Sequence, residues 1–322
     1  MRQLTGAWGN LGRWARGDSW TVGLIVIFVA LFILTKFLRP TYGLDALAIA
    51  SLPVAFAAVG QAIVVISGGI DLSVGSVMAL TNVIAASLLL SYPELSIPVV
   101  IFVLLVGLLI GAINGILVVV SRVPDIVVTL SMLFVWAGAA LLVMGTPGGA
   151  SAPWLREISS GTLGIDLIPR ALVALLVVVF AVWIPLRRSR LGLSIYAVGS
   201  NRLAAFRSGV NVERTKIAAY ALTGLFASLG GLALTASTGI GTPTPGPYLL
   251  LSVAAIVLGG VSLAGGRGGL LGPIIGIYIL GIIRADLTFI GMEPAFSTVI
   301  QGVIMVIVVM VGAYLTLRRR AA

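Results

Sequence analysis

SGGIDLSVGS, at residues 67–76, is a polar stretch between two apolar runs, 45–66 and 73–90, each long enough to enter a bilayer. Gly68 and Gly69 allow the chain to leave a helix, and Asp71 or Ser73 can cap the next helix by accepting its free backbone N–H groups. An ionisable residue at membrane depth is energetically costly and therefore indicates a functional site. For Asp71 a satisfied structural cap is favoured over direct solute contact, and the sequence leaves both roles open.

The composition around this stretch is that of an integral membrane protein. Of the 322 residues, 59% are hydrophobic and only 9% are charged, too few to cover the surface of a soluble globule. Because one crossing takes about 20 helical residues, the chain has room for about ten spans. We predict an all-α membrane protein with one transmembrane domain over residues 1–322 and about ten helices, some of them short or broken. The expected spans are 20–38, 45–66, 73–90, 98–120, 126–144, 168–186, 217–237, 250–264, 269–290 and 296–315.

The positive charges predict the orientation of these spans. With the N-terminus in the cytoplasm, 15 of the 20 lysines and arginines lie inside, four lie outside, and Arg284 falls within a span. Cytoplasmic loops carry the excess of Lys and Arg, so we expect both termini in the cytoplasm. The net charge of +10 is then a topology signal and not an indication of nucleic-acid binding, because the basic residues lie at the edges of apolar runs.

Two connections are longer than the rest. Residues 145–167 are rich in Gly, Pro and Ser and are expected to form an external loop that a soluble partner can contact. Residues 187–216 form the only sizeable internal segment. Within it, 202–210 is expected to form a short helix, with Asn201 as its N-cap and Gly209 as its C-terminal stop. Such a helix suits docking to another protein.

Several polar residues lie within apolar runs. Asn114 lies among small residues in GAING, which favours close helix packing with the amide hydrogen-bonding across the contact. Gln61, Asn82 and Gln301 can line a route for a hydroxyl-rich solute or pair between helices, and the sequence does not separate these roles. GGIDLSVG at 68–75 also aligns with GGVSLAGG at 259–266, which suggests an internal repeat in which Ser262 replaces Asp71.

Several classes of chemistry are excluded by what the sequence lacks. It has no cysteine and no histidine, so it has no disulfide, no thiolate zinc site and no histidine proton shuttle. There is no Walker A pattern, HExxH motif or GxSxG elbow. We therefore predict a protein that is not an enzyme, with no catalytic residue, no metal site and no cofactor bound by this chain.

Three local patterns resemble the permease subunits of ribose-type monosaccharide ABC importers, in the branched-chain amino acid/ribose permease superfamily. They are SGGIDLSVGS at 67–76, AVGSN at 197–201 with the alanines and SGV that follow, and VLGG through SLAGGRG at 257–268. The resemblance implies an ATP-binding ATPase subunit, a soluble sugar-binding protein, a second permease copy or paralogue, and surrounding lipid. By this resemblance the residues that couple the chain to the ATPase are Asn201, Ala204, Ala205, Ser208 and Gly209.

The sequence departs from the family pattern within this coupling segment. Leu203 stands where an acidic residue is common, and Phe206-Arg207 stands where arginine-leucine is usual, which bears on which ATPase is accepted. The main alternative is an ion-coupled secondary transporter of a small polar solute, with Asp71 as the coupling carboxylate. A channel is a weaker alternative, because no filter-like sequence is present. The sugar itself is not indicated.

Overall fold

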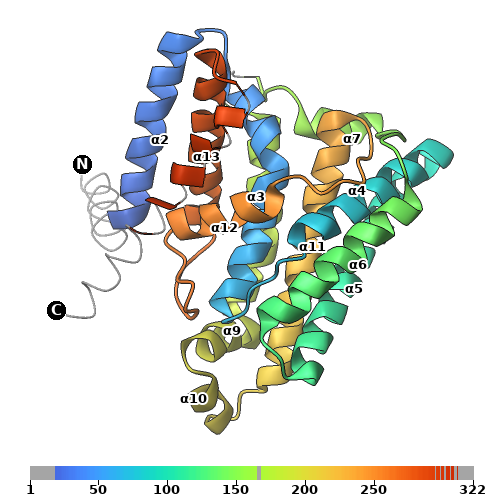
Figure 1. The fold of residues 1–322 in the computed structure, drawn as a ribbon, viewed down its shortest axis with the longest axis vertical. Coiled ribbons are helices and arrows are strands. Elements are labelled where there is room, and N and C mark those ends of the chain that lie inside the picture. Colours follow the sequence, from blue (N-terminus) through green and yellow to red (C-terminus); the bar gives the residue numbers. More distant parts are fainter. Residues whose placement is uncertain are drawn as a thin grey trace, which may run out of the picture.

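The computed structural model describes residues 19–164 and 168–293, together with isolated residues and short stretches between 295 and 310. Within these residues the chain is a bundle of helices (Figure 1). The predicted all-α membrane fold is thus confirmed. In chain order the helices are α2 (Ser19–Leu38), α3 (Leu44–Ile66), α4 (Val74–Ser91), η1 (Pro93–Leu95), α5 (Ser96–Ser121), α6 (Asp125–Val143), α7 (Pro153–Ser159), α8 (Arg170–Arg188), α9 (Arg190–Ser200), α10 (Arg202–Arg207), α11 (Val212–Thr238), α12 (Tyr248–Leu258) and α13 (Leu271–Phe289).

Eight of the described helices, α2 to α6, α8, α11 and α13, are long and apolar enough to cross a membrane. Two shorter apolar helices, α12 and a segment at Ala295–Ile304, lie near the other two predicted spans. The predicted span 250–264 is wrong in extent, because α12 has 11 residues and is therefore only about 16 Å long. Half of the predicted span 296–315 lies outside the described residues, and so do Gln301 and the terminal arginines.

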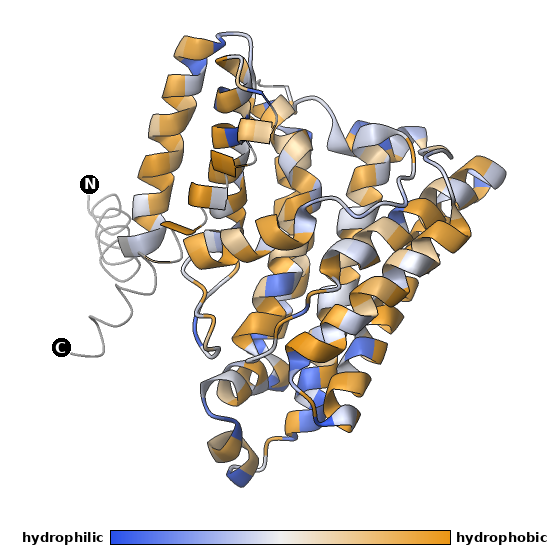
Figure 2. Ribbon diagram, viewed as in Figure 1, coloured by the Kyte–Doolittle hydropathy of each residue, from blue (hydrophilic) through white to orange (hydrophobic). Residues whose placement is uncertain are grey.

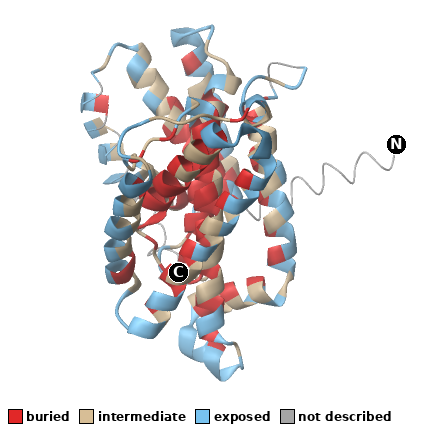
Figure 3. Ribbon diagram, turned by 90° about the vertical axis from the view of Figure 1, so that its right-hand side faces the viewer, coloured by how far each residue is buried: buried red, intermediate tan, exposed pale blue. Residues whose placement is uncertain are grey.

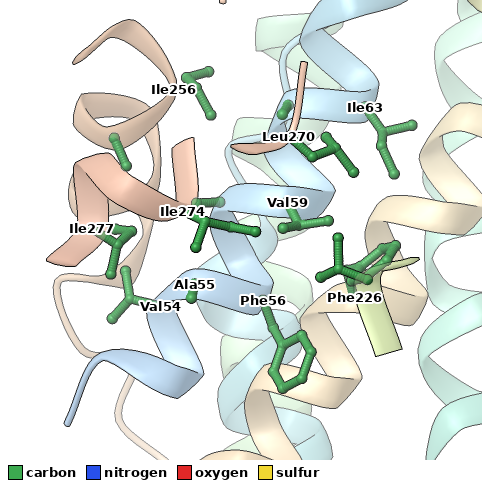
Figure 4. Packing of buried hydrophobic residues seen from close by; sticks show 14 of the residues in the cluster. Val54, Ala55, Phe56, Val59, Ile63, Phe226, Ile256, Leu270, Ile274 and Ile277 are labelled. Atoms are coloured by element: carbon green, nitrogen blue, oxygen red, sulfur yellow. The ribbon is translucent and has the colours of Figure 1, made fainter. Parts of the chain in front are cut away.

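The bundle has one central helix and an apolar periphery. In the most apolar 18 residues of α3, 89% are buried, whereas only 17% are buried in the corresponding stretches of α2 and α6. The buried residues gather at the centre of the bundle (Figure 3). Around α3 pack Phe226 of α11, Ile256 of α12, and Ile274 and Ile277 of α13 (Figure 4). The outer helices are hydrophobic along much of their length (Figure 2). Many of their apolar side chains are exposed, among them Phe134. This distribution suits a surface solvated by lipid.

Glycines allow a close contact between α5 and α11. A Cβ at Gly111 would collide with the carbonyl of Tyr220, and a Cβ at Gly115 would lie 2.8 Å from the Cα of Ile217. Helices in a membrane approach closely where small residues face one another. The close packing predicted around Asn114 is therefore confirmed, and it brings the Asn114 side chain into the core, with no exposed surface.

Two helix pairs are interrupted in the same way. At the end of α3, Gly68 has φ 79°, and the N–H groups of Gly68 and Gly69 donate to Val65 and Val64. At the end of α12, Gly260 has φ 79°, and the N–H groups of Gly260 and Val261 donate to Val257 and Ile256. Both are Schellman C-terminal motifs. We call residues 67–73 the first break and residues 259–270 the second break.

The internal repeat suggested by sequence needs a shift of one residue. The backbone pairs Gly68 with Gly260, whereas the sequence alignment pairs Gly68 with Gly259. In the structural register Leu263, and not Ser262, stands where the first break has Asp71. The expectation that the carboxylate is not duplicated holds in either register.

Candidate functional site

A chain of hydrogen bonds starts in the first break and ends on α6. Asp71 Oδ1 accepts from the backbone N–H and the hydroxyl of Ser73, at 2.8 and 2.6 Å. Asn114 Nδ2 donates to Ser73 Oγ at 2.8 Å, and Trp136 Nε1 donates to Asn114 Oδ1 at 3.1 Å. We call these four residues the polar chain. It joins the first break to α5 and α6 through side-chain hydrogen bonds. Asp71, Ser73 and Asn114 are each at most 2% exposed.

The polar chain refines the capping prediction for Asp71 and Ser73. Ser73 is the N-cap residue of α4, but its hydroxyl accepts no bond from the first turn of that helix. The hydroxyl instead links Asp71 to Asn114. Asp71 supplies the accepting oxygen, and it accepts from the N-cap residue itself. Two hydrogen bonds to one oxygen of Asp71 fix the direction in which the chain enters α4.

A second group, which the sequence analysis did not predict, holds the same break from the other side. Lys216 Nζ lies 3.0 and 2.9 Å from the two carboxylate oxygens of Asp125. The Tyr220 hydroxyl lies 3.0 Å from Asp125 Oδ2 and 3.2 Å from the carbonyl of Ile70, and Thr129 also donates to that carbonyl, at 3.2 Å. We call Asp125, Thr129, Lys216 and Tyr220 the clamp.

The clamp explains the second glycine of the motif. A Cβ at Gly69 would lie 2.9 Å from Asp125 Oδ2 and 3.0 Å from the Tyr220 hydroxyl. The ion pair itself is largely buried, with side-chain exposures of 9% for Lys216 and 18% for Asp125. It joins residues that are 91 positions apart, and no motif marks either of them. Sequence alone therefore offered no signal for this pair.

The coupling segment contains the short helix that was predicted, with one correction to its end. Asn201 is the N-cap of α10, and its Oδ1 accepts from the N–H of Ala204 at 2.9 Å. The helix ends at Arg207 and not at residue 210, because Gly209 has φ 82° and its N–H donates to Phe206. An additional helix, α9, precedes it, so the predicted loop 187–216 is mostly helical.

The predicted coupling residues do not all face outward. Ala205 is 5% exposed and packs with Val198 of α9 and Val212 of α11, so it holds α10 against its neighbours. Ser208 donates back to the carbonyl of Ala204 at 2.9 Å. The apolar side chains that do project are Leu203, 58% exposed, and Phe206, 67% exposed. A groove beside α10 is lined by these two side chains and by Arg202, Gly209, Val210, Asn211, Val212 and Glu213.

The other polar residues within spans have different surroundings. Asn82 pairs between helices and loops, because its Nδ2 donates to Thr235 Oγ1 at 2.8 Å and its Oδ1 accepts from the N–H of Thr242 at 2.7 Å. Gln61 of α3 has no exposed surface, and neither end of its amide has a hydrogen-bond partner among the described residues. Asn82 is thus a structural residue in this conformation, and Gln61 is a buried amide without a partner.

The fold and these sites define a multi-span helical membrane protein in which two helix pairs are interrupted beside a short helical segment. Residues 43–309 match the family described as branched-chain amino acid transport system / permease component. The chain is 36% identical over 262 residues to the ribose import permease protein of Escherichia coli K12, covering 80% of this chain and 81% of that protein. It is 34% identical over 266 residues to the fructose import permease protein of Rhizobium meliloti, covering 79% and 73%.

A third relative is the galactose/methyl galactoside import permease protein of Haemophilus influenzae, 34% identical over 279 residues that cover 80% of this chain and 82% of that protein. No solved structure gives a match. The chain belongs to this permease family, within the sugar-import permeases of ABC transporters. It is a multi-pass membrane subunit and not itself an ATPase, because ATP is handled by a partner subunit in such transporters.

Proposed function

We propose that this chain moves a monosaccharide of the pentose or hexose type across a bacterial inner membrane. A soluble binding protein delivers the sugar, and a separate ATPase docks on α10 and drives the movement. The relatives named for ribose, fructose and galactose support the sugar class, and they differ too much in substrate to select one sugar. Differential binding of ATP by the partner then shifts the permease between its inward-open and outward-open states.

The observation that carries this proposal is the geometry of α10. Six residues are held at one end by the Asn201 cap and at the other by the Gly209 turn. Such a short helix has little stability alone, so caps and packing must fix it. Leu203 and Phe206 project from it at 58% and 67% exposure. Rigid apolar side chains on a protruding segment bind a partner with a small entropic cost.

The proposed orientation places both termini, α9 and α10 in the cytoplasm. The positive charges of 187–216 support it, since cytoplasmic loops are rich in Lys and Arg. A second permease, either a copy of this chain or a paralogue, completes the pathway, and lipid covers the exposed apolar faces of the outer helices. In this account Asp71 has a structural role and holds Ser73 at the start of α4, which its two bonds from Ser73 and its 2% exposure support.

Affinity purification of the tagged chain from its native membrane tests the proposal. The expected result is recovery of a Walker-motif ATPase by mass spectrometry, and its loss from the Leu203→Asp/Phe206→Asp variant. The matched control is Ile158→Asp on α7, which changes an apolar side chain of 49% exposure in the loop expected outside. Recovery of the chain alone, with solute accumulating in liposomes on an ion gradient, would overturn the proposal in favour of a secondary transporter.

A further inference from the structure

Three segments that are far apart in sequence meet at glycines next to the first break. Gly199 of α9 lies between the end of α3 and the second break. A Cβ at Gly199 would collide with the carbonyl of Ile66 and lie 2.7 Å from the backbone nitrogen of Gly266. A Cβ at Gly265 would lie 2.8 Å from the carbonyl oxygen of Gly199 and 3.0 Å from the Cα of Gly68. We call Gly68, Gly199, Gly265 and Gly266 the glycine junction.

Hydrogen bonds lock the same three segments together. The N–H of Gly266 in the second break donates to the carbonyl of Ile66 in α3, at 2.9 Å. The Tyr196 hydroxyl of α9 donates to the carbonyl of Gly268, at 2.8 Å. Burial raises the pKa of Tyr196 above its ordinary value, so the hydroxyl keeps its proton and remains a donor. Figure 1 shows the loop that follows α12 reaching down to α9.

The contacts of Gly199, Gly265 and Gly266 join backbone to backbone, which makes the junction stiff. A long side chain can take up a small displacement by changing rotamer, whereas two peptide groups in contact cannot. Packed elements of this kind move as a unit between discrete arrangements. A shift of α9 at Gly199 must therefore move the end of α3 and the second break together, or break the contacts of both.

The docking helix is attached to this junction over a very short distance. Gly199 lies two residues before Asn201, the N-cap of α10, and the N–H of Asn201 donates to Ala197 at 3.1 Å. Val198 of α9, Ala205 of α10 and Val212 of α11 form one small buried cluster. A displacement of α10 therefore reaches Gly199 by two routes. One is the last turn of α9, and the other is the packing of Ala205 against Val198.

We propose that the glycine junction is the positioning device that passes movement of α10 to both interrupted helix pairs at once, α3–α4 and α12–α13. This inference rests on the proposed docking of an ATPase at α10. Gly199 is its central residue, because it alone of the four belongs to the docking segment and contacts both breaks. Movement of α10 then displaces both breaks together, and the two breaks keep their positions relative to each other.

The test compares Gly199→Ala with wild type in the reconstituted complex of permease, ATPase and binding protein in liposomes. The variant is expected to retain the ATPase and to hydrolyse ATP, because Leu203 and Phe206 are untouched. Sugar carried per ATP hydrolysed is expected to fall, within the range of about 5- to 150-fold typical of coupling between sites. The matched control is Gly269→Ala in the second break, where an added Cβ meets nothing within 4 Å and wild-type coupling is expected.

A second variant keeps the test decisive if Gly199→Ala does not fold. Tyr196→Phe removes only the hydroxyl that ties α9 to Gly268, and it is expected to lower sugar per ATP while retaining the ATPase and the yield of folded protein. If Tyr196→Phe, and Gly199→Ala where it folds, carry as much sugar per ATP as wild type, the proposed role of the glycine junction is wrong and the proposed function stands. Absence of an ATPase from the wild-type chain would instead overturn the proposed function itself.

Discussion

The first and second breaks begin with the same C-terminal motif, yet their surroundings are opposite. In the first, Ser67, Gly69, Asp71 and Ser73 are buried, and side chains from α5, α6 and α11 bond to it. In the second, Leu263 is 46% exposed, and a bond from the N–H of Ser262 to the carbonyl of Arg267 closes its loop. The shared motif therefore ends a helix in both places, but it does not determine which contacts hold the loop that follows.

This difference shows which elements hold each break. The first is bonded to membrane helices by the polar chain and the clamp. The second is bonded to α9, through Tyr196 and through the contact of Gly266 with Ser200, whose hydroxyl lies 3.5 Å from the Gly266 carbonyl. It is also bonded to the end of α3, through the N–H of Gly266. We infer that the first break is held mainly by the membrane helices around it and that the second is held mainly by the coupling segment.

The largest expected effect comes from breaking the clamp. Asp125→Asn leaves the Lys216 ammonium buried without a carboxylate, and loss of one partner from a buried ion pair costs about 3–5 kcal/mol. Unfolding in mixed detergent micelles measures this loss. The matched control is Glu157→Gln, which breaks an ion pair with Arg170 in which Glu157 is 74% exposed, so a loss of at most about 1 kcal/mol is expected.

A double variant separates the clamp's charge from its packing. Asp125→Leu combined with Lys216→Met removes both charges, and it is expected to recover part of the stability that Asp125→Asn loses. Equal losses in the control and in Asp125→Asn would contradict the view that the first break is anchored by this pair.

The second prediction uses the motif that the two breaks share. Gly68→Ala and Gly260→Ala each place a side chain in the left-handed region, which costs about 1–2 kcal/mol. At Gly260 the added Cβ would also lie 2.8 Å from Trp20 Cδ1, whereas at Gly68 the nearest atom is Gly199 Cα at 3.4 Å. Overpacking adds about 1–3 kcal/mol, so Gly260→Ala is expected to lose more stability. A larger loss in Gly68→Ala, measured in the same micelles, would contradict this order.

The third prediction concerns the polar chain. Asp71→Ala leaves the N–H and the hydroxyl of Ser73 without their acceptor, which costs about 1–3 kcal/mol for a buried group. Asp71→Asn keeps an accepting oxygen, so it is expected to fold with a smaller loss. Both variants are expected to reduce sugar uptake in the reconstituted complex, and wild-type uptake by folded Asp71→Asn would remove any functional role of the charge.

Local chemistry let the sequence predict most helix positions. The apolar run 45–66 lies within one residue of α3, and the glycines of 67–76 mark the following break. The predicted span 250–264 failed because its composition stays apolar through Ala264, while the backbone turns at Gly260 and ends α12 at Leu258. The adjacent glycines Gly259 and Gly260 were the sequence signal for this helix end. The span was instead assigned from the apolar composition on both sides of them.

The site was predicted only where its contacts are local. Asn201 and Gly209 act on their own helix, so capping rules located both. The clamp and the glycine junction depend on contacts between segments 59 or more positions apart and on which helices become neighbours. One sequence does not contain that information. The roles of the coupling residues in ATPase docking stay a prediction that the purification experiment tests.

The smallest expected effect is the clearest contrast between the breaks. Leu263→Asp places a carboxylate at the position of the second break that corresponds to Asp71 in the structural register. Because Leu263 is 46% exposed, the new charge stays solvated, and a change within about 0.5 kcal/mol is expected. The matched variant in the first break is Ile70→Asp, at a half-buried residue whose carbonyl accepts from the Tyr220 hydroxyl, where burial of an unpaired carboxylate is expected to destabilise the fold. Equal stability of these two variants would mean that the first break tolerates charge as the second does, and the inference that buried contacts with the membrane helices hold the first break would then be wrong.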